Sequence, residues 1–123
     1  MKIRSHNELD VYKFAFESAV MVFELSKKFP SHEKFSLTDQ MRRSSRSVCA
    51  NLAEAFRKRK YPKHFISKLN DSESEAAETQ VWLEFALKFN YILENQYSTL
   101  NEKYNFILGK LVNMSNQPEK WSY

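Results

Sequence analysis

The chain contains very little glycine, proline and cysteine. Its 123 residues include one glycine, three prolines and one cysteine. A phosphate-binding P-loop needs two glycines and a dinucleotide-binding fingerprint needs three, so both motifs are excluded. A fold with many tight β-turns is also disfavoured, because such turns need glycine where φ is positive. The lone cysteine, Cys49, excludes an intrachain disulfide and a zinc site built from several cysteines.

Long apolar runs are missing as well. No stretch approaches the roughly 20 apolar residues of a membrane span, and residues 1–10 are too polar for a secretory signal peptide. We therefore expect a soluble cytoplasmic protein with no membrane partner. The 15% aromatic content favours a chain that builds a core over a disordered one. The length predicts a single domain over residues 1–123.

Catalytic and metal-binding patterns are also absent from the sequence. No histidine follows a glutamate at the Glu-x-x-His spacing of di-iron bundles, and no two histidines have zinc-ligand spacing. Cys49 is expected to be a small packed residue. The sequence therefore predicts no enzyme activity, no catalytic or metal-binding residue, no cofactor and no small-molecule substrate.

The spacing of apolar residues predicts four helices, at residues 7–29, 36–58, 62–92 and 98–115. Ser36 is the expected N-cap of the second helix, and Pro62 fits the first turn of the third. Gly109 is expected on the outer side of the fourth helix, where it costs about 1 kcal/mol relative to alanine. Short connections between such helices are typical of an all-α, antiparallel, up-down-up-down four-helix bundle.

The first helix is apolar over more than half of its circumference, whereas an outer helix of a monomeric bundle needs an apolar stripe of about 100°. It carries two stripes, one with Tyr12, Phe16 and Phe23 and the other with Val11, Val22 and Phe29. The excess predicts a homo-oligomer. Its interface is expected to use the second stripe and an apolar edge of the third helix: Val11, Val22, Leu25, Phe29, Trp82, Phe85 and Phe89.

Charge is strongly segregated within a net charge of +4. Residues 42–68 hold nine basic side chains against one acid, Glu54, whereas residues 71–84 hold five acids and no base. Such a basic stretch can neutralise phosphates, and Tyr61 and Phe65 could stack on single-stranded bases. Alternatively, the basic stretch pairs with the acidic start of the third helix, or it is a solvated face that aids solubility. The expected phosphate contacts are Arg42, Arg43, Arg46, Arg57, Lys58, Arg59, Lys60 and Lys63.

Polar residues flank the apolar stripes of the second and third helices. Buried polar groups need partners, so these residues favour a hydrogen-bonded seam between the two helices over a small polar pocket. Glu75 or Glu78 is expected to meet Arg43 or Arg46 there. The predicted seam comprises Gln40, Ser44, Asn51, Glu54, Glu75 and Glu78.

The second predicted helix carries a recognisable pattern: Leu37, Gln40, the pair Arg42 and Arg43, a serine-rich step over 44–47, and then Asn51 and Glu54. This pattern, with residues 78–83 and 114–121 downstream, resembles the bacterial 23S rRNA intervening-sequence protein family. The resemblance implies an antiparallel four-helix bundle that assembles as a homopentamer and is not an enzyme. Some members of the family are encoded within insertions in large-subunit rRNA genes. Another protein of similar architecture, the accessory protein of diversity-generating retroelements, works with reverse transcriptase and RNA.

One residue departs from the family pattern. Ala55 stands where the family usually has glycine, which predicts a looser helix contact at that point. Two hypotheses remain open from the sequence. The first is a homo-oligomeric bundle that binds RNA or another nucleic acid through its basic surface. The second is a structural or adaptor oligomer that acts through protein–protein contacts, with its basic stretch paired to the acidic start of the third helix.

Overall fold

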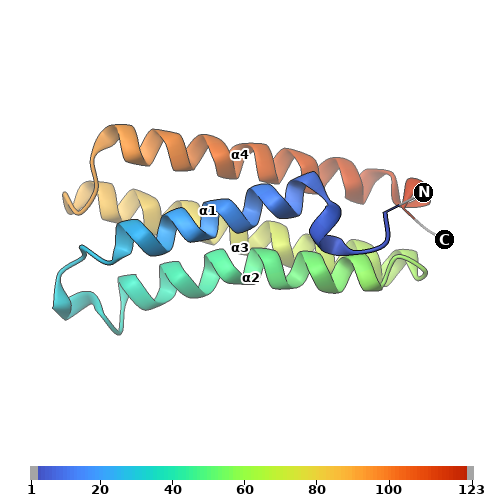
Figure 1. Ribbon diagram of the computed structural model, residues 1–123, viewed down its shortest axis with the longest axis horizontal. Coiled ribbons are helices and arrows are strands. Elements are labelled where there is room, and N and C mark those ends of the chain that lie inside the picture. The colour runs from blue at the N-terminus through green and yellow to red at the C-terminus, as the bar shows by residue number, and fades with distance from the viewer. Residues whose placement is uncertain (1–2, 122–123) are drawn as a thin grey trace.

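The computed structural model describes residues 3–121, and every regular element within that range is helical. Four long helices are joined by short connections, which confirms the predicted all-α bundle (Figure 1). Residues 1–2 and 122–123 of the predicted domain lie outside the described residues. The long helices are α1 (Asp10–Ser26), α2 (Leu37–Arg57), α3 (Pro62–Lys88) and α4 (Glu94–Asn116). Short 3₁₀ helices are η1 (His6–Glu8), η2 (Ser31–Glu33) and η3 (Pro118–Lys120).

The long helices lie side by side along the longest axis of the molecule (Figure 1). The α1–α2 and α3–α4 connections lie at one end of the bundle, and the α2–α3 turn lies at the other end with η1 and η3. Both α1 and α3 pack against α2 and α4, so α1 and α3 occupy opposite corners. None of the helices within residues 3–121 is long and apolar enough to cross a bilayer.

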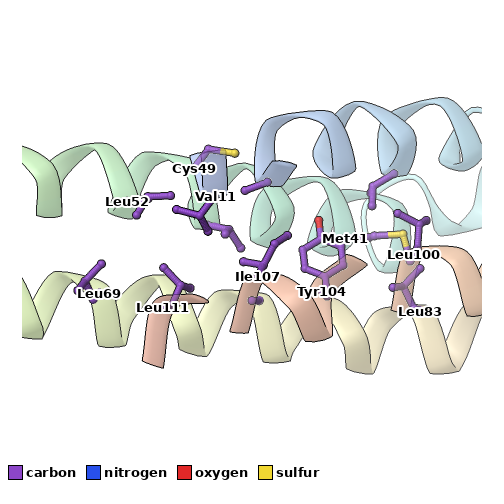
Figure 2. Packing of buried hydrophobic residues seen from close by; sticks show 14 of the residues in the cluster. Val11, Met41, Cys49, Leu52, Leu69, Leu83, Leu100, Tyr104, Ile107 and Leu111 are labelled. Carbon is purple, nitrogen blue, oxygen red and sulfur yellow. The ribbon is translucent and has the colours of Figure 1, made fainter. Parts of the chain in front are cut away.

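Apolar side chains from all four helices fill the centre of the bundle (Figure 2). In α4, the apolar residues Leu100, Tyr104, Ile107 and Leu111 lie on one stripe and are all fully buried. Ala55 is fully buried too, and α2 continues past it to Arg57. The core thus accommodates the methyl group of this alanine.

The N-terminus of α2 is capped differently from the prediction. The Ser36 side chain makes no capping hydrogen bond to the helix. Instead, Glu33 Oε1 accepts hydrogen bonds from the backbone N–H of Leu37 at 3.3 Å and from the Ser36 hydroxyl at 2.6 Å. Tyr91 donates to the other Glu33 oxygen at 2.8 Å. One carboxylate therefore caps α2 and also joins the two connections at that end of the bundle.

Two other helix boundaries each lie four residues earlier in the chain than predicted. The third helix ends at Lys88 rather than at residue 92, because Asn90 adopts a left-handed backbone with φ of 61°. Asparagine is one of the few residues other than glycine that tolerate this conformation. The fourth helix begins at Glu94, four residues before the prediction, where the Gln96 side chain accepts a hydrogen bond from the Leu93 N–H at 2.8 Å.

Candidate nucleic-acid interface and apolar groove

The turn between α2 and α3 forms a basic end of the bundle. It closes without glycine, because the Lys58 N–H donates to the Ala55 carbonyl at 2.9 Å and the Tyr61 N–H donates to the Lys58 carbonyl at 2.9 Å. Pro62 then begins α3, as predicted. This short turn holds a group of exposed basic side chains at one point. Its members, which we call the basic end, are Arg57, Lys58, Lys60 and Lys63.

In the part of the chain that the structure describes, acidic side chains do not neutralise the four charges of the basic end. No carboxylate among residues 3–121 forms an ion pair with any of them. Arg59 behaves differently, because its Nε donates to the Phe56 carbonyl at 2.8 Å and its guanidinium lies 3.6 Å from the centroid of the Phe56 ring. Its side chain therefore packs against the end of the bundle.

The two aromatic residues expected to stack on bases differ sharply in exposure. Tyr61 lies within the basic end and is 54% exposed. Its ring lies nearly perpendicular to that of His64, with ring centroids 6.0 Å apart, and Lys60 Nζ lies 6.0 Å from its ring centroid. Phe65 is only 1% exposed, so its predicted role in base stacking is wrong. Phe65 falls on the face of α3 that packs into the core, which makes it a core residue.

Arg43 lies in the middle of α2 and is engaged by the acidic part of α3. Its Nη1 lies 3.0 Å from Glu75 Oε2, and its Nη2 lies 2.5 Å from Glu78 Oε2. Partial burial acts to raise the pKa of Glu75, but the hydrogen bonds and positive charge of Arg43 outweigh it and hold that pKa below its usual value. The same carboxylates raise the pKa of the Arg43 guanidinium. Arg43 therefore forms an ion-pair network with α3, which confirms the predicted contact between this arginine and Glu75 or Glu78.

Two further arginines of α2 lie against α1. Arg42 Nε donates to the Ser26 hydroxyl at 2.8 Å, and its guanidinium lies 4.6 Å from the centroid of the Phe23 ring. Arg46 is exposed and lies 5.9 Å from the same ring. Arg46 and Arg57 are separated by about 16 Å along the helix. The eight predicted phosphate contacts therefore form two groups, and the group at the turn includes the four side chains of the basic end, which have no ion-pair partner among residues 3–121.

A hydrogen-bonded seam joins α2 and α3. The Ser44 and Thr79 hydroxyls are 2.8 Å apart, and the Ser72 hydroxyl donates to the Val48 carbonyl at 2.8 Å. Ser44, Ser72 and Thr79 are all buried. Of these three buried residues, only Ser44 belongs to the predicted seam set. Ser72 and Thr79 carry a weaker sequence signal, because serine and threonine on a helix can also hydrogen-bond to their own backbone.

The other predicted seam residues lie at its margin. Gln40 accepts a hydrogen bond from Arg43 Nε at 3.4 Å, and Glu75 and Glu78 hold the same arginine. Asn51 does not reach α3, because its side-chain amide donates to the Ser47 carbonyl of its own helix at 3.0 Å. Glu54 forms an exposed pair with Lys68 at 3.4 Å, and Asp71 lies 3.9 Å from the same lysine.

An open apolar groove of about 460 Å³ runs between α1 and α2. Phe16 and Val20 are 54% and 46% exposed along it. The small side chains of Ala50 and Ala53 line it on α2, together with the charged side chain of Arg46. We call this feature the α1–α2 groove. Its lining residues are Tyr12, Phe16, Ala19, Val20, Phe23, Arg46, Cys49, Ala50 and Ala53.

The predicted oligomer interface on α1 is wrong for three of its residues. Val11, Val22 and Phe29 were assigned to an outer surface, but they are 5%, 0% and 8% exposed and belong to the core. The stripe with Phe16 and Val20 faces outward instead. Both stripes are apolar, so the sequence alone does not decide which one turns inward.

The remaining predicted interface residues are only partly covered. Leu25 and Trp82 are half-buried, whereas Phe85 in α3 and Phe89 directly after it are 46% and 48% exposed. These two phenylalanines pack side by side, with ring centroids 5.8 Å apart.

Reactive chemistry is sparse in the described part of the chain. Within residues 3–121, no three histidine, cysteine, aspartate or glutamate side chains come together as metal ligands. Cys49 is buried as predicted, and this burial raises the pKa of its thiol to about 11. The thiol is therefore protonated at neutral pH and is a poor nucleophile.

Fold and surfaces together define an all-helical four-helix bundle that displays a basic end and an open apolar groove. A model of the 23S rRNA-intervening sequence protein family matches residues 7–113 of this chain. The chain therefore belongs to that family.

A solved relative supports the same assignment. It is a protein of unknown function from the S23 ribosomal protein family of Bacteroides thetaiotaomicron. The two chains share 33% sequence identity, and the match covers 86% of this chain and 95% of that one with a TM-score of 0.78. No curated protein matches the chain.

Proposed function

We propose that this protein is a non-enzymatic, self-associating bundle that binds RNA or another nucleic acid through its basic end. The observation that supports the proposal is the concentration of Arg57, Lys58, Lys60 and Lys63 at one exposed turn without an ion-pair partner among residues 3–121. Cationic side chains that neutralise phosphates release condensed counterions, so the resulting affinity depends strongly on salt.

Self-association is proposed to use the α1–α2 groove and the exposed edge of α3. The groove lies between α1 and α2, whereas Phe85 and Phe89 lie at the C-terminal end of α3, and both surfaces are apolar. Two different surfaces on one chain favour head-to-tail contacts, which close into a ring when the rotation allows it. A ring agrees with the homopentamer that the family resemblance implies, and it would place several basic ends in one particle.

Binding is tested with a fluorescently labelled RNA of about 20 nucleotides, titrated between about 50 and 200 mM salt. The test variant replaces Lys58, Lys60 and Lys63 with alanine. We expect the slope of log affinity against log salt to fall by about 2 to 3, since each lost phosphate contact contributes about 0.7 to 0.9.

The matched control also removes three exposed lysines, but at the opposite end of the bundle: Lys28, Lys34 and Lys88. It should keep most of the affinity and the slope of the unmodified protein. If the unmodified protein fails to bind at low salt, or if both triple variants lose the same affinity, the proposed interface is wrong.

Light scattering tests self-association. We expect an oligomer at micromolar concentration, and we expect Val20→Glu to dissociate it because the charge would be buried in the groove. The control is Val112→Glu, which changes an exposed valine of α4 outside both surfaces. A monomer of 14.6 kDa for the unmodified chain would contradict the proposal.

One observation favours the adaptor hypothesis. Arg43 and Lys68 pair with carboxylates of α3, as that hypothesis expects of the basic stretch. It predicts that a protein copurifies from the native host and that nuclease treatment leaves this protein bound. Loss of all copurified material after nuclease treatment would favour the nucleic-acid proposal.

A further inference from the structure

An exposed tyrosine lies within the basic end. Tyr61 is 54% exposed and directly follows Lys60 in the turn that carries Lys58 and precedes Lys63. Its ring lies nearly perpendicular to the His64 ring, and its hydroxyl makes no hydrogen bond to residues 3–121. An aromatic face is therefore available to a ligand at the place where unpaired positive charge is concentrated.

The chemistry of such a surface distinguishes two kinds of nucleic acid. A duplex offers phosphates and groove edges, because its bases are stacked on one another. A single strand also offers the flat face of unpaired bases, and stacking on an aromatic side chain contributes about 1 to 3 kcal/mol per base. Recognition of a duplex groove usually needs a projecting helix, whereas α2 and α3 pack against each other and meet at the turn.

We propose that Tyr61 stacks on an unpaired base while the lysines of the basic end neutralise the phosphates beside it. The ligand class is therefore single-stranded nucleic acid. This inference rests on the proposed function and adds to it the class of ligand and the residue that selects it. Unpaired bases occur in single-stranded RNA and DNA alike, so both are included in the test.

The experiment compares Tyr61→Ala and Tyr61→Phe with the unmodified protein, using a single strand and a duplex of equal length, in RNA and in DNA. We expect Tyr61→Ala to weaken single-strand binding by about 5- to 150-fold, which is the stacking contribution converted to an affinity ratio. Tyr61→Phe should bind the single strand to within about twofold of the unmodified protein, because phenylalanine keeps the aromatic ring. Duplex binding should be unaffected by either variant.

A second exposed aromatic residue supplies the control. Phe35 is 86% exposed but lies in the connection before α2, at the opposite end of the bundle from the turn. Phe35→Ala should leave single-strand binding unchanged. A 2-aminopurine base in the strand should lose fluorescence on binding, as stacked 2-aminopurine does, and this loss should disappear in Tyr61→Ala but persist in Phe35→Ala.

The outcomes separate the two proposals. If binding depends on the lysines of the basic end but Tyr61→Ala changes single-strand and duplex affinity equally, the stacking inference is overturned and the proposed function stands. If the lysine variant binds as well as its control, the proposed function fails first. Selective loss of single-strand binding in Tyr61→Ala supports the inference. If only the RNA strand shows this loss, the inference holds for RNA alone, and if the DNA strand shows it too, the inference holds for both nucleic acids.

Discussion

Replacing Arg43 with alanine should separate stability from binding. The guanidinium contacts two α3 carboxylates, and the side chains of Arg43, Glu75 and Glu78 are 43%, 20% and 32% exposed. Exposed ion pairs contribute about 0 to 1 kcal/mol, whereas breaking a buried pair costs about 3 to 5 kcal/mol. This network is half-buried and solvent screens it, so we expect Arg43→Ala to lower the free energy of unfolding by about 2 kcal/mol.

Urea denaturation followed by circular dichroism measures this loss. For a chain of this length, the loss corresponds to a fall in Tm of about 8 °C. Arg43→Lys should recover only part of it, because an ammonium group cannot hold two carboxylates with the planar geometry of a guanidinium. Affinity for single-stranded RNA should change by less than about twofold, since Arg43 is engaged internally.

The matched control removes the same charge from the basic end. Lys58→Ala should weaken RNA binding and leave the free energy of unfolding within about 0.5 kcal/mol of the unmodified protein. If Arg43→Ala unfolds at the same urea concentration as the unmodified protein but binds RNA poorly, the division of roles between Arg43 and the turn is wrong.

The effect of Arg43 should also depend on pH. The pKa of Glu75 is lowered in the folded protein, so its contribution to stability is present above the pKa of an unfolded glutamate. That contribution is lost as pH falls through the folded pKa. The difference in Tm between the unmodified protein and Arg43→Ala should therefore shrink as pH is lowered from 7 towards 3. A difference that stays constant over this range would refute the proposed ion-pair origin.

Three further substitutions should change stability in a defined direction. Tyr104→Phe should raise the free energy of unfolding by about 1 to 3 kcal/mol, because the buried Tyr104 hydroxyl has no hydrogen-bond partner among residues 3–121; a lower urea midpoint would show that this hydroxyl is satisfied. Gly109→Ala should raise it by about 1 kcal/mol, since no atom lies within 4 Å of the added methyl group and α4 gains helix propensity; an unchanged midpoint would contradict this. Hydrogen bonds from Ser36 and Tyr91 lower the pKa of Glu33, so its contribution to stability is lost as pH falls through that pKa. Glu33→Gln should therefore reduce the fall in Tm between pH 7 and pH 3. An unaltered pH dependence of Tm would exclude Glu33 as a contributor.

Much of the fold follows from the sequence because its local signals agree. Apolar spacing places all four helices, and the shortage of glycine and proline leaves few places where a helix can end. Gly109 lies on the exposed side of α4 as expected. The helix ends were harder to place, because Glu33 caps α2 through a side chain three residues before Ser36. Asn90 ends α3 with a conformation usually reserved for glycine.

The candidate site was predicted less well, for a reason that is also physical. A run of basic residues shows how much charge a segment carries, but not which charges meet a carboxylate in the folded chain. Arg43 and Lys58 look equivalent in the sequence, yet Arg43 faces the acidic part of α3 and Lys58 faces outward. Similarly, the two apolar stripes of α1 are equally apolar, and packing against α2 and α4 decides that Val22 is buried and Val20 is exposed.

Photo-cross-linking of a single-stranded RNA that contains 4-thiouridine, followed by mass spectrometry, most directly tests whether the basic end binds nucleic acid. The proposed interface predicts that the cross-linked peptides centre on residues 57–63 and that cross-linking declines as salt is raised. Cross-links confined to the α1–α2 groove or to residues 42–46, or no cross-link at low salt, would contradict it.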